Sequence, residues 1–291
     1  MRLKRPVYAG SPRLPEISQQ LLGAAALMAL AVAPLHADEQ KPLWEFGLGV
    51  GAYVFNDYRG SDTMHAYPIP VPYFVYRGEI LKSDHDGPRA RFFNRDAIEF
   101  SLSINATTPV RNDSVRQGMP DLKPTLELGG SLDFHLWRSA DHRVKLDLRL
   151  PARAAVTVEA SPRIIGVYTE PQINLDVAQL PGAEGWKLGL LGGPLFADRR
   201  YDSYFYTVAA HYATPERPAY EAHGGYAGTQ ALISLSRRYP GYWIGAFIRH
   251  DFLGGASFAA SPLVKTNSYW SGGIGVTWVI RQSSHNVASD D

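Results

Sequence analysis

Two groups of polar residues carry the side-chain types that catalysis or metal binding would need. Asp133 and His135 are two positions apart, so on a strand they would share one face and could form an acid/base pair. A hydrolase would also need a nucleophile beside them, and the sequence holds no Gly-x-Ser-x-Gly elbow. Charged pairs are also the ordinary filling of a β-barrel lumen. We therefore predict no catalytic residue and no enzyme activity.

The segment Ser83-Asp84-His85-Asp86-Gly87 offers carboxylates and an imidazole to a metal, but this composition is typical of a solvated loop. Gly47, Gly49 and Gly51 have neither the spacing nor the following helix of a dinucleotide-binding loop. We interpret these glycines as packing room inside a crowded barrel. No metal site and no cofactor is predicted.

The elements that would hold these residues are strands with two different faces. Near the C-terminus, large apolar residues alternate with small or polar ones, and the first such run of the chain shows the same pattern. A period of two predicts strands whose two faces meet different solvents. The closing strand of a barrel must pair with the first, so that no edge is left open in lipid. The apolar faces of these two runs are Trp44, Phe46, Leu48, Val50, Ala52 and Val54, and Trp270, Ile274, Val276, Trp278 and Ile280.

Further alternating runs fill the chain between these two ends. They lie at residues 98–105, 126–136, 144–150, 165–177, 186–196, 227–238 and 241–252, and short candidates lie at 79–82 and 89–93. Residues 67–76 carry three prolines on one parity and predict an irregular strand near a rim. The Tyr-rich residues 200–224 fit either another short hairpin or a long outer loop folded over the mouth. Counted as a loop, they give an all-β transmembrane antiparallel β-barrel of about 12 strands, with short periplasmic turns and longer extracellular loops.

Composition alone would suggest an ordinary soluble domain, because the mean hydropathy is −0.19. A transmembrane barrel, however, buries its apolar band in alternation and hides it from windowed hydropathy. The absence of Cys fits an oxidising compartment. Charges of both signs on the inner face of residues 144–150 predict a polar, partly filled lumen.

The N-terminus predicts export through a cleaved signal peptide. Four basic residues precede an apolar run at residues 21–35, and Ala37 precedes the polar Asp38. We expect residues 1–37 to be a signal peptide, 38–280 an outer-membrane barrel, and 281–291 a disordered polar C-terminal tail. Removing residues 1–37 takes away four basic residues and one acidic residue. The remaining 25 basic and 27 acidic residues give a net charge of −2, so nothing favours nucleic-acid binding.

Several short motifs, in order over nearly the whole mature chain, resemble the MltA-interacting protein (MipA) / OmpV family of outer-membrane proteins. They are Gly47-Leu-Gly-Val-Gly, Asp57-Tyr-Arg-Gly-Ser-Asp62, the Pro-alternating residues 67–76, Gly118-Met-Pro-Asp-Leu122, Gly193-Pro-Leu-Phe-Ala-Asp198, Tyr212-Ala-Thr-Pro-Glu-Arg-Pro-Ala-Tyr220, Gly224-Gly-Tyr226, Gly255-Ala256 and Ser261-Pro-Leu-Val264.

The resemblance implies a non-enzymatic barrel of the Gram-negative cell envelope, a scaffold that brings a periplasmic lytic transglycosylase together with a peptidoglycan synthase. The lipid of the outer membrane is its other expected partner. Two alternatives stay open: a small-solute pore, which the polar lumen permits, and an adhesin, a role the family also includes.

Overall fold

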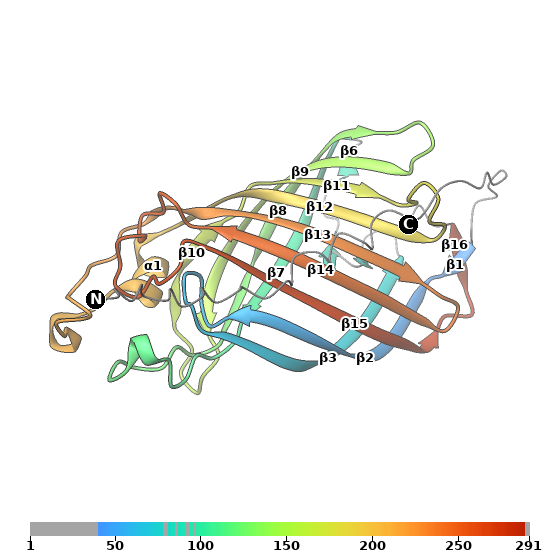
Figure 1. The fold of residues 1–291 in the computed structure, drawn as a ribbon. Helices are drawn as coiled ribbons and strands as arrows, with labels where there is room; N and C mark the ends of the chain where they lie inside the picture. Colours follow the sequence, from blue (N-terminus) through green and yellow to red (C-terminus); the bar gives the residue numbers. More distant parts are fainter. Residues whose placement is uncertain (1–39, 78–80, 85–86, 91–93, 96, 289–291) are drawn as a thin grey trace, which may run out of the picture.

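The structure is a computed structural model that describes residues 40–77, 81–84, 87–90, 94–95 and 97–288. Long antiparallel strands follow one another around a barrel (Figure 1). They are β2 (Trp44–Asn56), β3 (Met64–Arg77), β7 (Ile98–Thr107), β8 (Thr125–Arg138), β9 (Val144–Thr157), β12 (Trp186–Ala197), β13 (Gly225–Arg238), β14 (Tyr242–Phe252) and β15 (Ser268–Gln282). The expected signal peptide and cleavage site lie outside the described residues.

The wall of the barrel has twelve strands, as predicted. The described sheet contains 14 strand segments. β10 (Ile164–Thr169) and β11 (Gln172–Val177) count as one strand between β9 and β12, interrupted at Glu170 and Pro171. The two-residue β6 (Asn94–Arg95) only extends the turn into β7. The short hairpin of β4 (Leu81–Asp84) and β5 (Gly87–Ala90) continues from β3, and β5 lies beside β7, where the two ends of the sheet meet.

The alternation predicted from the sequence matches the two faces of the wall. Leu48, Val50 and Ile274 are 50 to 66% exposed and point away from the lumen, where lipid would cover them. Glu45, on the opposite parity of the same strand as Leu48, is only 3% exposed. The barrel therefore presents an apolar outer band and a polar interior, which is the pattern of a transmembrane barrel.

The first and last long strands of the chain pair as expected. The glycines of β2 allow the backbones of β2 and β15 to approach closely. Residues 45–54 of β2 pair with residues 272–282 of β15. A Cβ atom on Gly49 would collide with the Val276 carbonyl oxygen and the Thr277 Cα, and one on Gly47 with the Trp278 carbonyl oxygen. The glycines therefore serve packing.

The prediction that residues 67–76 form an irregular strand near a rim is wrong. β3 pairs with β2 without a register shift from Met64 to Tyr76. On its other side the described residues pair only at Tyr76 and Arg77, with β4. Pro68, Pro70 and Pro72 therefore lie along an edge with no described ladder, the place where a strand tolerates proline because no N–H is required.

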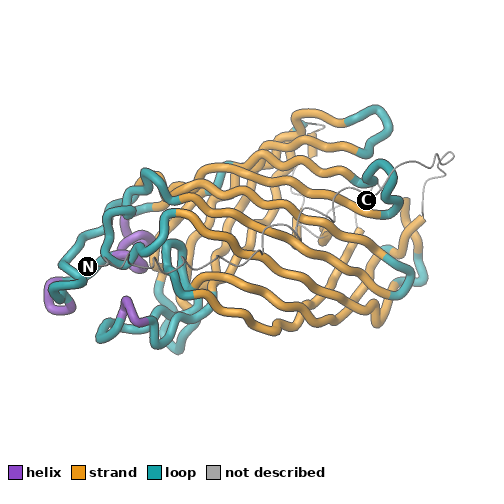
Figure 2. The backbone as a smooth tube through the Cα atoms, viewed as in Figure 1, coloured by secondary structure: helices purple, strands orange, loops and turns teal. Residues whose placement is uncertain are grey.

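The connections differ sharply between the two ends of the barrel. At one end, here called the loop end, lie residues 57–63, 108–124, 158–163, 198–224 and 253–267. Figure 2 shows the helical segments gathered there. At the opposite end, the turn end, lie the short connections 139–143, 178–185 and 239–241. This asymmetry agrees with the predicted short turns and long loops.

Residues 198–224 form the second predicted alternative, a long loop at the mouth, and not another hairpin of the barrel. They contain α1 (Arg199–Tyr206) and η2 (Ala210–Tyr212), while η1 (Ser114–Arg116) lies in the 108–124 loop. Asp198 caps α1, because its carboxylate accepts a hydrogen bond from the Tyr201 N–H at 2.8 Å. In the described part of the chain, no helix is long and apolar enough to cross a membrane.

The C-terminal residues are more ordered than predicted. β15 continues through Gln282, and β16 (Asn286–Ala288) pairs with β1 (Gln40–Pro42) in a two-stranded ribbon at the turn end (Figure 1). The expected disorder is therefore wrong for residues 281–288. Pairing of the two chain ends gives their backbone groups partners that a free tail would lack.

The assignment of faces predicts unequal effects for neighbouring substitutions on β9. Leu150 lies near the middle of this 14-residue strand and points toward lipid, so Leu150→Arg should destabilise the folded barrel by about 2–4 kcal/mol. Leu146→Arg, near the turn end, should cost only about 0–1 kcal/mol. Asp147→Asn should cost much less than Leu150→Arg, because the side chain points inward and the asparagine still offers a hydrogen-bonding group to His135. Urea unfolding in lipid vesicles measures all three; equal losses for Leu150→Arg and Asp147→Asn would mean that the register is shifted by one residue.

Candidate functional site

The lumen near the turn end is crossed by one ion pair. Arg238 on β13 donates to the Glu45 carboxylate on β2 from Nη2 at 2.7 Å and from Nε at 3.2 Å. The Tyr73 hydroxyl donates to the same carboxylate at 3.3 Å. Because β2 and β13 are separated by β14 and β15 in the wall, the pair spans part of the lumen. Arg238 thereby offsets the free-energy cost of burying the charged Glu45 carboxylate.

Halfway along the lumen, Asp133 is held by two serine hydroxyls. The Ser101 hydroxyl donates to Oδ2 at 2.8 Å, and the Ser131 hydroxyl donates to Oδ1 at 2.5 Å. His135 is oriented by other residues: its Nδ1 lies 2.9 Å from Asp147 Oδ1 and its Nε2 lies 3.8 Å from Glu99 Oε2. The structure therefore places both candidate catalytic residues on the lumen face, but gives each its own partners.

Nearer the loop end, Glu127 is fully buried among donors. The hydroxyls of Tyr168 and Tyr201 donate to its carboxylate at 2.5 and 3.0 Å, and the Asn105 amide donates at 2.8 Å. Tyr201 lies on α1, whereas Glu127 and Tyr168 lie on β8 and β10. Glu127 thus connects the helix to the wall, and its charge is distributed over several hydrogen bonds.

A second buried carboxylate links the wall to the first loop. Asp251 on β14 accepts from Arg59 Nε at 3.2 Å and from Arg249 Nε at 2.8 Å. Arg59 belongs to the 57–63 loop and also donates from Nη1 to the Ala227 carbonyl oxygen at 2.8 Å. Asp251 is fully buried, so removing either arginine would leave much of its charge uncompensated.

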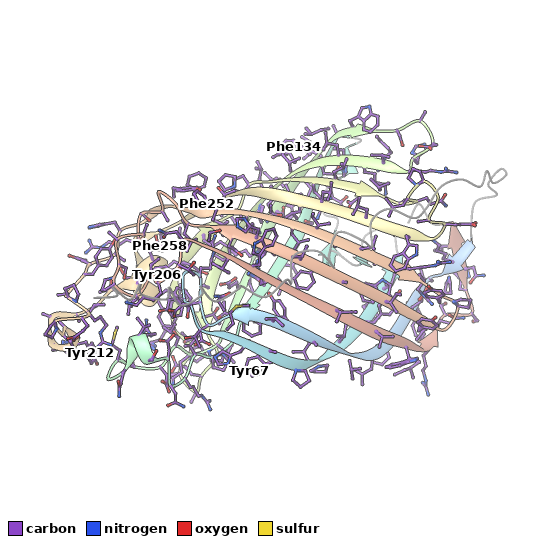
Figure 3. The ribbon with its side chains drawn as sticks, viewed as in Figure 1. Tyr67, Phe134, Tyr206, Tyr212, Phe252 and Phe258 are labelled. Carbon is purple, nitrogen blue, oxygen red and sulfur yellow. The ribbon has the colours of Figure 1, made fainter. Side chains whose placement is uncertain are left out.

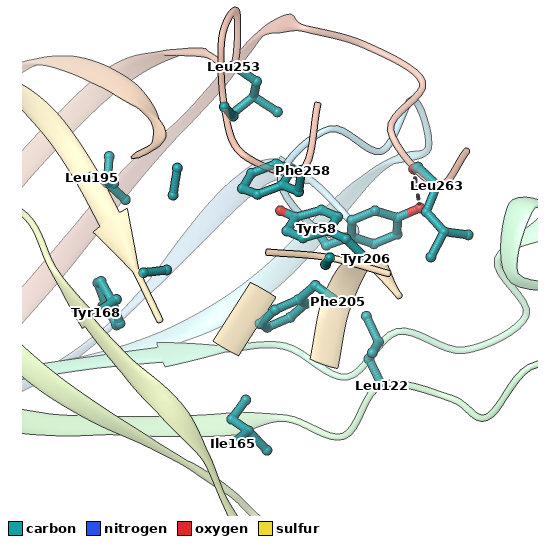
Figure 4. Packing of buried hydrophobic residues seen from close by; sticks show 14 of the residues in the cluster. Tyr58, Leu122, Ile165, Tyr168, Leu195, Phe205, Tyr206, Leu253, Phe258 and Leu263 are labelled. Atoms are coloured by element: carbon teal, nitrogen blue, oxygen red, sulfur yellow. Dashed lines mark hydrogen bonds between the residues drawn. The ribbon is translucent and has the colours of Figure 1, made fainter. Parts of the chain in front are cut away.

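Above these groups, the loops pack into one buried apolar cluster, here called the cap. It joins Tyr58, Leu122, Tyr206 and Phe258, each from a different loop (Figure 4). The rings of Tyr206 and Phe258 stack at 3.7 Å between centroids, and both lie at the loop end, with Tyr212 further out (Figure 3). Three of these loops leave the contiguous strands from β3 to β12, and the fourth leaves β7/β8 elsewhere in the wall, so the cap joins loops from separate parts of the mouth.

Two arginines tie the loops of the cap together through backbone carbonyls. Arg217 Nη1 donates to the carbonyl oxygens of Val115 and Gln117 at 2.8 and 2.9 Å, and its Nη2 donates to that of Tyr212 at 2.7 Å. Arg116 Nη1 donates to the Phe205 carbonyl oxygen at 2.8 Å. The 108–124 and 198–224 loops are therefore fixed to each other by contacts in both directions.

Asp202 on α1 is a buried carboxylate of the cap that lacks a full set of hydrogen-bond partners among the described residues. Its side chain is fully buried, and Oδ2 accepts from the Ser257 hydroxyl at 3.0 Å. Within the described structure, Oδ1 has no hydrogen-bond partner. Burial raises the pKa of Asp202 to about 7; the Ser257 hydroxyl and the Arg59 charge lower it, and Asp198 raises it. The carboxyl therefore titrates near neutral pH.

Below the cap, a cavity of about 650 Å³ remains inside the barrel. Tyr53, Trp243 and Phe247 contribute rings to one part of its lining. The other part is polar and comes mainly from β7, β8, β9 and β14, with these residues: Ser101, Ser103, Ser131, Asp133, Arg149, Arg153 and Arg249. This cavity, here called the chamber, is large enough for a small molecule.

Two further segments were considered in the sequence, the possible metal-binding residues 83–87 and the Tyr-rich residues 200–224. The described residues contain no group of three His, Cys, Asp or Glu side chains arranged to hold a metal. His85 and Asp86 of the 83–87 segment lie outside those residues. A loop over the mouth was one of the two alternatives predicted for residues 200–224, but its packing against the other three loops was not predicted. The tyrosines of residues 201–226 were the signal for this loop in the sequence.

The profile of the MltA-interacting protein MipA family matches residues 48–280, most of the 291-residue chain. The chain belongs to the MipA family. No curated protein matches it.

Solved structures with a similar arrangement are distant in sequence. The toluene transporter TodX of Pseudomonas putida is 10% identical, with 82% of this chain and 68% of that chain covered and a TM-score of 0.27. The CymD monoaromatic hydrocarbon channel is also 10% identical, with 84% and 90% covered and a TM-score of 0.31.

The position of Asp202 predicts a cap that loosens as pH rises. In an opened cap its pKa would return toward 3.8, whereas in the closed cap it is about 7. The closed cap therefore binds the proton more tightly, and closure weakens as pH rises from about 4 to about 7. The chain has no Cys, so one spin label on Ala213→Cys reports cap mobility. Mobility should increase over this range, and Asp202→Asn should abolish the dependence; an unchanged pH response in Asp202→Asn would assign it to another group.

Proposed function

We propose that this barrel is an outer-membrane, non-enzymatic scaffold whose turn end faces the periplasm and binds a lytic transglycosylase. The observation that carries the proposal is membership of the family described as MltA-interacting protein, over residues 48–280. A peptidoglycan synthase would be the second partner on the same side. Export through the signal peptide ending at Ala37 would deliver the chain to this membrane.

The lumen supports a structural role over a catalytic one. Asp133 is engaged by two serines, Glu127 by Tyr168, Tyr201 and Asn105, and Asp251 by two arginines. Groups used in this way hold the wall and the cap together.

The turn end supplies the surface that a periplasmic partner would use. The turns 139–143, 178–185 and 239–241 are short, and a stable interface usually buries about 800 Å² on each partner. The ribbon of β1 and β16 extends this end beyond the turns. In the described structure β16 pairs only with β1, so the outer edge of β16 offers backbone groups for strand addition.

The scaffold proposal predicts that the ribbon contributes to partner capture. Deleting residues 283–291 should leave barrel assembly intact but weaken capture of purified MltA in a pull-down. Val287→Pro should have a similar effect, because Val287 pairs with Lys41 and proline removes its N–H. Ser284→Pro, in the bend before β16, is the matched control. Unchanged capture in both variants would remove the ribbon from the interface; capture that instead needs the 198–224 loop would favour an adhesin.

The cap predicts that the wild-type barrel does not conduct as an open pore. The backbone of Gly224 lies against Asp198 and Arg199, so residues 199–223 can be replaced by a short Gly-Ser link without spanning a gap. In planar bilayers we expect no steady open-channel current from the wild type, and open-channel steps from the shortened variant. Steady conductance of the wild type would favour the small-solute pore over the scaffold.

A further inference from the structure

One wall of the chamber is formed by aromatic rings that lie over glycines of β14 and β15. Gly245 and Gly273 leave room where the rings of Trp243 and Phe247 lie, since a Cβ atom on either glycine would meet those rings. The rings of Tyr53 and Phe247 are 5.4 Å apart and face the same chamber. An apolar group of a ligand would be desolvated against this wall.

The lining of the chamber carries more positive than negative charge. Arg149 and Arg153 lie on β9, Arg249 lies on β14 two residues from Phe247, and Asp133 is the one carboxylate among the lining residues. Both Asp133 oxygens already accept from serine hydroxyls. Arg153 Nη1 lies 3.2 Å from the Glu170 carboxylate.

Arg249 has two guanidinium Nη groups that a ligand in the chamber could use. Its Nε donates to Asp251 at 2.8 Å, while both Nη groups have no hydrogen-bond partner among the described residues. Its side chain is 27% exposed, in contact with the chamber. Because Asp251 is fully buried and fixed by Arg59 as well, it holds the guanidinium in place. A fixed guanidinium with two available Nη groups matches the geometry of a carboxylate.

We propose that the chamber binds a small amphipathic carboxylate, with its head on Arg249 and its apolar body against Phe247 and Tyr53. The volume of about 650 Å³ is within the range of small-molecule sites. The ligand adds a binding activity to the barrel that is separate from any periplasmic partner, and it does not depend on the scaffold role.

A pair of soluble probes tests the proposal directly. 3-Phenylpropionate and 3-phenylpropan-1-ol share the ring and chain and differ in the carboxylate. Equilibrium dialysis against the full-length mature barrel in lipid nanodiscs, with empty nanodiscs as the blank, measures their binding. We expect saturable binding of one phenylpropionate per barrel and binding of the alcohol weaker by about tenfold or more, because a charged hydrogen bond is lost.

Variants on one strand locate the site. Ser234 lines the chamber on β13, and its neighbour Ile233 is 50% exposed on the outer face. Ser234→Phe should fill the chamber and abolish phenylpropionate binding, whereas Ile233→Phe should leave it unchanged. Arg249→Gln should weaken binding about tenfold or more, and Arg249→Lys should restore part of it.

Folding of each variant is checked by the shift in gel mobility between heated and unheated barrel, and Arg249→Gln carries the test if Ser234→Phe does not fold. Absence of saturable binding above empty nanodiscs would overturn the proposal. So would equal binding of the acid and the alcohol, or equal loss in Ile233→Phe and Ser234→Phe.

Discussion

The structure depends on one constraint: no backbone N–H or C=O group can remain unpaired in the lipid core of a membrane. An antiparallel sheet satisfies this only if it closes on itself. The two ends of the sheet meet where β5 lies beside β7, and the first and last long strands of the chain, β2 and β15, pair over nearly their whole length. The glycines of β2 are a consequence, because the backbones at this junction approach too closely for a Cβ atom. The prolines of β3 reduce the same requirement. They lie along an edge whose described residues pair only at Tyr76 and Arg77, and because proline has no N–H, these positions leave no donor without an acceptor.

Closing the wall creates a second problem, since the inward positions of twelve strands enclose a lumen. Near the turn end and near the loop end, buried carboxylates fill it: Glu45 with Arg238, Glu127 with two tyrosines, and Asp251 with two arginines. Each of these links strands that are not neighbours, or links a strand to a loop. The electrostatic cost of burying charge is thus offset by contacts that brace the barrel across its interior. Between them, where glycines and serines replace larger side chains, the chamber remains.

The wall was largely predictable from the sequence, because lipid outside and water inside impose a period of two on every strand. Leu48 and Glu45 could be assigned to opposite faces with no knowledge of their neighbours. The break at Glu170 and Pro171 and the full length of β3 were not predictable, since both depend on which adjacent strand is present to accept a hydrogen bond. A loop over the mouth was one alternative for residues 200–224, but the packing of four loops into the cap could not be predicted. Tyr58, Leu122, Tyr206 and Phe258 are far apart in the sequence and follow no period, so only the three-dimensional meeting of four loops brings them together.

The cap and the ribbon divide the barrel into two ends with different physical character. At the loop end, stacked rings and arginine-to-carbonyl hydrogen bonds hold the long loops together. At the turn end, short turns leave little side-chain area, and the ribbon of β1 and β16 extends this end beyond the turns. Arg59 connects the two levels inside: its carbonyl oxygen accepts from Tyr206 of the cap at 2.9 Å, and its guanidinium holds Asp251, which orients Arg249 in the chamber. Arg59 is therefore a contact that the cap and the chamber share, whereas the ribbon lies at the opposite end of the barrel (Figure 1).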